Sequence, residues 1–241
     1  MKIITTSWDD GDILDFKIAE YLEKYKLKGT FYIPKHIPGR KVMNEENLYN
    51  LSERFEIGGH TLNHTNLKKA SSKQVAYEVG GCYKWLTEVT GCKPVSFCPP
   101  KGYYSNDVIT EIYSTGFKII RTTNLLSPFS AGKLANTTLQ VYEHSSFTLF
   151  KNIMKRGRIN SLNVWLQGGA SSNLLNMVDY YLNYILKNDG CLHIWGHSWE
   201  IEQKGLWPKL EQILKEVSGM QDVQYLENKQ LIDKSFLCEF S

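Results

Sequence analysis

The chain has 241 residues, a formal net charge of +3, 42% hydrophobic residues and 22% charged residues. This composition is that of an ordinary globular protein with a substantial core, and we expect one domain over residues 1–241. The small net charge argues against a nucleic acid partner. Basic runs at 68–69 and 155–158 are interpreted as solvated faces, with a role near an anionic carrier as the alternative.

Short apolar runs alternate with longer amphipathic stretches along the chain, which is the pattern of βα units. A long loop is expected around the strand at 138–142, because residues 123–145 are rich in Thr, Ser and Asn. Strands are predicted at 2–5, 30–33, 55–57, 95–97, 117–122, 138–142, 162–166, 191–195 and 223–226. Helices are predicted at 12–25, 71–89, 106–114, 174–186 and 209–217, with a short one after the last strand.

Two adjacent carboxylates and two histidines are the candidate metal-binding residues. Asp9 and Asp10 follow the first apolar run, and His60 follows the third strand, with His64 four residues further on. One helical turn or a tight loop can aim both imidazoles at a common point. One carboxylate and two imidazoles can hold a divalent ion and leave a position open for water or substrate. The second carboxylate needs a role of its own, because neighbouring aspartates repel each other. A helix cap and two surface histidines are the structural alternatives.

Two histidines, His193 and His197, belong to the last inner strand and its end, and their positions differ. Residues 191, 193, 195 and 197 share one face of the strand, so alternation cannot choose between them. His193 lies within the apolar run, where a hydrogen-bonded core histidine is expected, whereas Gly196 ends the strand before His197. We therefore expect His197, and not His193, to be exposed at the end of the strand. His144 is interpreted as a loop histidine that could line the cleft.

Five cysteines, an odd number without CxxC spacing, argue against a disulfide framework and against a cysteine-rich zinc site. Reduced, mostly buried thiols fit a cytoplasmic protein. The first seven residues lead almost directly into Asp9 and Asp10, so no signal peptide is expected. No apolar stretch reaches membrane-spanning length. We therefore expect a cytoplasmic protein without a transmembrane segment. The cysteines are Cys82, Cys92, Cys98, Cys191 and Cys238.

The ordered set of motifs resembles the polysaccharide deacetylases of the NodB-homology type, carbohydrate esterase family 4. The resemblance covers residues 3–200 and implies an α/β fold, a distorted (β/α) barrel with about seven strands. It rests on Ser7-Trp8-Asp9-Asp10-Gly11, Gly29-Thr30-Phe31-Tyr32-Ile33, Gly59-His60-Thr61-Leu62-Asn63-His64, Phe97-Cys98-Pro99-Pro100-Lys101-Gly102 and Ile194-Trp195-Gly196-His197.

The resemblance implies a role for each matching residue. Asp9 would be the catalytic base, and Asp10, His60 and His64 would hold one divalent metal ion. Zn²⁺ is the ion expected first, with Co²⁺ or another transition metal as the alternative. His197 would be the general acid, and the sequence from 197 to 200 is similar to the H-x-W-E of one branch of the family.

Four further residues are candidate contacts for the substrate. Pro100 preserves the loop of the third motif, and a backbone N–H near Tyr103 would face the oxyanion of the reaction. Trp165 and Trp199 fall near predicted strand ends, where aromatic side chains form either a sugar-stacking platform or lid packing.

Cys98 is the departure from the family pattern, because it occupies the position of an arginine that orients the base. Arg121 ends the next strand, and the ends of successive strands are neighbours on the barrel rim. We therefore predict that its guanidinium lies within hydrogen-bonding distance of Asp9 and supports catalysis. The alternative is a surface ion pair. A nucleophilic role for Cys98 is disfavoured, since no partner base is suggested.

The resemblance implies a metal-dependent hydrolase that removes the N-acetyl group from an amino sugar or from its glycan-linked or carrier-linked form. Two alternatives remain open. One is a hydrolase of the same fold acting on a non-sugar amide or cyclic imide. The other is a catalytically impaired barrel that binds glycan, for which Cys98 is the reason.

Overall fold

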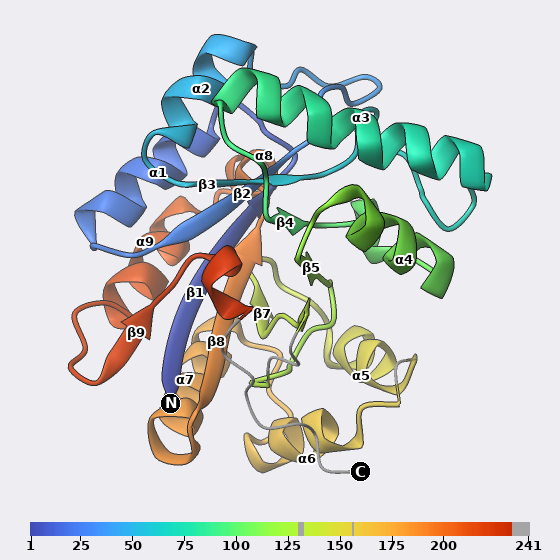
Figure 1. The fold of residues 1–241 in the computed structure, drawn as a ribbon. Coiled ribbons are helices and arrows are strands. Elements are labelled where there is room, and N and C mark those ends of the chain that lie inside the picture. The colour runs from blue at the N-terminus through green and yellow to red at the C-terminus, as the bar shows by residue number, and fades with distance from the viewer. Residues whose placement is uncertain (130–132, 156, 233–241) are drawn as a thin grey trace.

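The computed structural model describes residues 1–129, 133–155 and 157–232. Within these residues a parallel sheet is surrounded by helices (Figure 1). Its strands are β1 (Lys2–Asp9), β2 (Gly29–Ile33), β3 (Glu56–Gly59), β4 (Ser96–Phe97), β5 (Ile119–Arg121), β6 (Leu134–Ala135), β7 (Leu139–Gln140), β8 (Gly190–Gly196) and β9 (Val223–Tyr225).

The hydrogen-bonded order of the strands is β6-β5-β4-β3-β2-β1-β8-β7, and β9 pairs with the start of β1. The short strands β6 and β7 lie at the two ends of this order, and the sheet forms a curled half-barrel. The predicted α/β fold with a distorted barrel is confirmed. The prediction of about seven strands is close to the nine that the described residues form, three of which, β4, β6 and β7, have only two residues each.

The helices lie around the outside of the sheet (Figure 1). Several begin and end as their sequences suggest: the Ser71 side chain accepts a hydrogen bond from the backbone of Gln74, and Gly91 ends the same helix with a φ of 70°. The α-helices are α1 (Asp15–Lys24), α2 (Glu45–Ser52), α3 (Ser72–Thr90), α4 (Asn106–Thr115), α5 (Ser146–Lys155), α6 (Ile159–Gln167), α7 (Leu174–Asn188), α8 (Ser198–Gln203) and α9 (Trp207–Glu216). Two 3₁₀ turns are η1 (Pro100–Gly102) and η2 (Asn228–Leu231).

One predicted strand is wrong, because residues 162–166 lie within α6. Val164 and Trp165 are buried, whereas Leu166 is 54% exposed. A short apolar run fits a strand or a helix equally well, and here the burial of one side only follows the helical period. Helices α2, α5 and α8 and strand β6 were not predicted.

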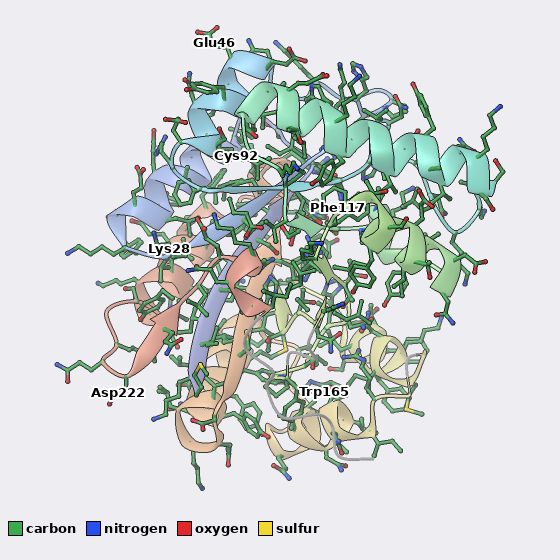
Figure 2. The ribbon with its side chains drawn as sticks, viewed as in Figure 1. Lys28, Glu46, Cys92, Phe117, Trp165 and Asp222 are labelled. Carbon is green, nitrogen blue, oxygen red and sulfur yellow. The ribbon has the colours of Figure 1, made fainter. Side chains whose placement is uncertain are left out.

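The centre of the sheet positions the site. Strand β1 is buried from Ile3 to Asp9 and pairs with β2 on one side and β8 on the other. Strand β3 approaches its neighbours closely because Gly58 and Gly59 lack side chains. A Cβ on Gly58 would lie 2.4 Å from the Tyr32 ring, and one on Gly59 would lie 2.7 Å from Phe117, a residue labelled in Figure 2.

The four cysteines in the described part of the chain are free, and three of them are buried, with Cys92 exposed. Cys238 lies outside the described residues, as does Arg156 of the basic run at 155–158. Among the described helices, none combines the length and the apolar character that crossing a bilayer requires. The cytoplasmic location and the single-domain organisation stay predictions.

Candidate metal centre and active-site pocket

The ends of β1 and β3 bring Asp10, His60 and His64 together, as predicted. The Nε2 atoms of His64 and His60 lie 3.2 Å and 3.5 Å from Oδ1 of Asp10. One ligand atom from each residue falls within 4.8 Å of the others. Asp10 has a φ of 84° and Gly11 a φ of 64°, so the chain turns sharply just after β1. This donor set, one carboxylate and two imidazole nitrogens, fits a divalent transition metal.

The two histidines are held by contacts outside the ligand group. The backbone carbonyl of Cys98 lies 2.6 Å from Nδ1 of His60, which must donate to it, so Nε2 is left free for a metal. His64 ends a tight loop rather than a helical turn, with positive φ values at Thr61 and His64. The Glu78 carboxylate from α3 accepts hydrogen bonds from the backbone of Asn63 at 2.8 Å and from its side chain at 2.9 Å.

Asp10 is a buried carboxylate whose charge is strongly favoured. Burial alone raises its pKa, but hydrogen bonds with His60 and His64 and the nearby His197 outweigh burial and hold that pKa well below its usual range. Oδ2 lies 3.1 Å from Nη2 of Arg40 and accepts a hydrogen bond from Nε1 of Trp199 at 3.0 Å. An ionised carboxylate with its second oxygen already engaged is suited to bind a cation through Oδ1.

Asp9 has a different partner. Nη2 of Arg121 donates a hydrogen bond to Oδ1 of Asp9, and Sγ of Cys98 lies 3.9 Å from Oδ2. Arg121 is fully buried, which excludes the surface ion pair. Its guanidinium lies 5.0 Å from the ring centre of Tyr32 and 4.7 Å from that of Trp195. The predicted proximity of Arg121 to Asp9 is confirmed, and the catalytic roles of both residues stay predictions.

His193 and His197 lie in different surroundings, one in the core and the other at the pocket. His193 is buried: Nδ1 donates to the Asn136 carbonyl at 3.1 Å, and Nε2 lies 2.8 Å from the Ser7 hydroxyl, whose proton it accepts. Burial lowers the pKa of His193 to about 3, so the ring is neutral. His197 reaches the pocket, with Nε2 3.9 Å from Oδ2 of Asp10 and Nδ1 3.2 Å from the Glu200 carboxylate. Its position fits the predicted general acid, whose role remains to be tested.

A pocket of about 440 Å³ lies at the carboxyl ends of the strands and is lined, among others, by Asp9, Asp10, His60, His64 and His197. Trp199 lines it, but Trp165 does not: that side chain comes from α6 (Figure 2) and is buried, with Nε1 donating to the Ser171 carbonyl at 2.9 Å. The prediction that Trp165 contacts substrate is therefore wrong. Pro100 and Tyr103 flank Lys101, which lines the pocket. Their substrate roles stay predictions.

Several lining residues were not assigned from the sequence. Arg40 comes from the segment between β2 and α2, and its guanidinium lies 4.1 Å from the ring centre of Trp199. No motif marks it; its only sequence signal is a charge next to Gly39. His144 does line the pocket, the possibility left open above. The other unassigned lining residues include Thr123, Leu125, Gln140, Thr148 and Asn152.

Known proteins resemble this chain in sequence over about half of its length. Residues 1–120 match the polysaccharide deacetylase family model. The chain is 28% identical over 127 residues to a peptidoglycan-N-acetylglucosamine deacetylase of Bacillus cereus, covering 49% of this chain and 55% of that protein. It is 27% identical over 115 residues to the peptidoglycan-N-acetylglucosamine deacetylase PgdA of Listeria monocytogenes, covering 46% and 24%. The chain thus spans about half of the first relative and a quarter of the second.

Solved structures resemble the whole chain. A Mycobacterium smegmatis protein assigned to the polysaccharide deacetylases is 16% identical with a TM-score of 0.69, covering 97% of this chain and 89% of that one. A carbohydrate esterase family 4 pseudoenzyme of Bacillus anthracis is 15% identical with a TM-score of 0.56, covering 97% and 66%. At these identities the likeness shows the fold alone. Together with the matches in sequence, it confirms the predicted resemblance.

Proposed function

We propose that this chain, a member of the polysaccharide deacetylase superfamily, removes the N-acetyl group from an amino sugar by metal-dependent hydrolysis of the amide bond. The sugar would be free or linked to a glycan or carrier. One observation carries the proposal: a possible metal-binding group and a second, arginine-paired carboxylate lie side by side in one pocket. This arrangement provides separate residues for holding an ion and for removing a proton.

Asp10, His60 and His64 would hold the ion, with Zn²⁺ expected first and Co²⁺ or another transition metal as alternatives. When bound, the ion supplies Lewis acidity toward water and the acyl group. Asp10 remains ionised for this purpose because its histidine contacts outweigh the effect of burial. The backbone carbonyl of Cys98 keeps the ring of His60 in the required tautomer.

The other polar residues would carry the protons. Asp9 accepts a proton from the attacking water, whose oxygen bonds to the acyl carbon. Arg121 holds the Asp9 carboxylate in one orientation through a buried ion pair. His197, held through Nδ1 by Glu200, donates a proton to the amine nitrogen as the carbon–nitrogen bond breaks. The products are acetate and a free amino sugar.

Release of acetate tests the proposal directly. Metal-loaded protein is incubated with N-acetylated sugar nucleotides, lipid-linked sugars and chitin oligomers, and acetate and free amine are measured. We expect equal amounts of both from at least one substrate, loss of activity with a chelator and recovery with added Zn²⁺ or Co²⁺. The Asp9→Asn variant is the control for contaminating activity. If the metal-loaded protein releases no acetate from any of these substrates, the proposal is wrong.

The second candidate is an inactive glycan-binding barrel. Cys98 in place of the motif arginine favours it, and one protein of similar fold is described as a pseudoenzyme. We rank it lower, because Arg121 supplies a guanidinium to Asp9 from the neighbouring strand. Binding of a chitin oligomer without acetate release would support this candidate. A non-sugar amide or cyclic imide stays open as an alternative substrate, and both belong in the same panel.

A further inference from the structure

Helix α5 directs different side chains to three sides. Leu149 and Ile153 are buried in the core. Thr148 and Asn152 line the catalytic pocket. A third set faces solvent, and at about 100° per residue its members share one face of the helix. They are Phe147, Phe150 and Met154, which are 70%, 43% and 52% exposed. An outward helix face is normally polar, so this apolar face is unusual.

Helix α6 also exposes large apolar side chains. Ile159 is 69% exposed and Leu166 is 54% exposed. The two helices contact each other and lie together at one side of the molecule (Figure 1). Five of the ten exposed large hydrophobic side chains in the described part of the chain therefore come from residues 147–166. Exposed apolar side chains gathered on two helices in contact are a candidate interaction surface.

The charge of this region is one-sided. Residues 144–178 contain four basic residues and none of the chain's 25 acidic residues. Lys151 is exposed, with Nζ 5.8 Å from the ring centre of Phe147. Arg158 instead points inward and donates to the carbonyl of Leu125 at 2.6 Å and to Oδ1 of Asn152 at 2.8 Å. The interpretation of 155–158 as a solvated face is thus wrong for Arg158.

We propose that this α5–α6 face, formed by Phe147, Phe150, Lys151, Met154, Ile159 and Leu166, docks on an anionic lipid bilayer. Exposed aromatic and aliphatic side chains enter the boundary between headgroups and acyl chains, and lysines attract anionic headgroups. An apolar face alone would also suit a protein partner. The lack of acidic residues from 144 to 178, together with the exposed Lys151, favours the lipid surface, because acidic residues would be repelled there.

The position of the face next to the pocket has a consequence for the substrate. Thr148 and Asn152 of α5 line the pocket, so a protein docked through α5 holds the pocket near the bilayer surface. A lipid-linked N-acetylated sugar would then reach the site without leaving the membrane. This last step rests on the proposed deacetylase function, whereas docking itself does not.

Sedimentation with vesicles tests the docking. The full chain is mixed with vesicles of phosphatidylcholine alone or with phosphatidylglycerol, at low and high salt. We expect binding to the anionic vesicles, weakened by salt. Phe147→Ser and Ile159→Ser should each weaken binding about tenfold, because an apolar side chain no longer inserts. Lys151→Glu should also weaken it about tenfold. Tyr77→Ser, at a side chain 64% exposed on α3, is the matched control and should bind like the wild type.

The outcomes are distinct. Absence of binding to anionic vesicles by the wild type overturns the proposal, as does equal weakening by Tyr77→Ser. A dimer in solution that Phe147→Ser dissociates, without vesicle binding, would assign the face to a second copy of the chain. Circular dichroism checks that each variant is folded. Vesicle binding without acetate release from any substrate would leave the docking intact and contradict the proposed function.

Discussion

Two adjacent carboxylates in the candidate active-site pocket are held by different partners, one by an arginine and the other by histidines. Asp9, the last residue of β1, is fixed by a buried arginine from β5. Asp10, one residue later, lies against two histidines of the loop after β3. Successive strand residues point to opposite faces, and the positive φ of Asp10 adds a turn between the two side chains. A single backbone turn thus separates a candidate base from a candidate ligand.

The largest effect should come from neutralising each carboxylate of this pair in turn. We expect Asp9→Asn to abolish turnover and keep the metal, because its carboxylate only moves a proton. Asp10→Asn should lose both, since two imidazoles hold a transition metal weakly. Metal content by mass spectrometry and acetate release measure the two properties. A near-normal kcat in Asp9→Asn would contradict the assignment of Asp9 as the base and Asp10 as the metal ligand.

His197→Ala should slow turnover by roughly 10²–10⁴-fold, the usual contribution of a general acid. The metal should remain bound, because Asp10, His60 and His64 are intact. His36→Ala, a change at a histidine that is not part of the pocket lining, is the control and should leave kcat unchanged. A loss of metal in His197→Ala would show that His197 is a metal ligand rather than the general acid.

Arg121→Met should lower kcat by roughly tenfold to a hundredfold without loss of metal, because Asp9 loses its orienting partner. The buried Asp9 charge is left unpaired, so the free energy of unfolding should fall by about 3–5 kcal/mol. Chemical denaturation and metal analysis separate the two effects. Cys98→Arg should not raise the rate above that of the wild type, since Arg121 already forms an ion pair with Asp9. A clear gain in rate would contradict the idea that Arg121 takes the place of the motif arginine.

The smallest effect on kcat is expected for His193→Gln. Burial lowers the pKa of His193 in the folded protein to about 3, from an ordinary value of 6.5. Between these values only the unfolded chain takes up the proton. The stability that the neutral ring provides is therefore present above pH 6.5 and is lost as pH falls toward 3, by up to about 1.4 kcal/mol per unit. Unfolding of wild type and variant between pH 7 and 5 should show a shallower slope in the variant. Equal slopes would contradict the neutral ring.

The sequence predicted the parts of the site that strands deliver. Asp9, Asp10 and His60 follow strands, and parallel strands bring their ends together. The position of Arg121 was predicted from strand adjacency, once Cys98 was found in place of the motif arginine, and Phe97 of β4 indeed pairs with Ile120 of β5. Burial could also be predicted for His193, because its neighbours in the strand are apolar.

The parts that were missed depend on tertiary contacts. Arg40 lies in a segment without periodicity, and only the folded loop brings it to Asp10. Glu78 looks like any surface glutamate of a helix, yet it is buried and binds the loop that carries His64. Trp165 was misplaced because five residues of apolar character cannot distinguish a strand from a helix.

The pairing of β1 with β8 has a consequence for the order in which the molecule assembles. Ile3 pairs with Cys191 and Trp8 with Gly196, so the strand that carries Asp9 finds one partner in a strand far along the sequence. Contacts of such long sequence separation form slowly, and β8 must have been synthesised before they can form. The pocket is thus among the last features to be completed, and during refolding the regain of activity should lag behind the regain of helix content.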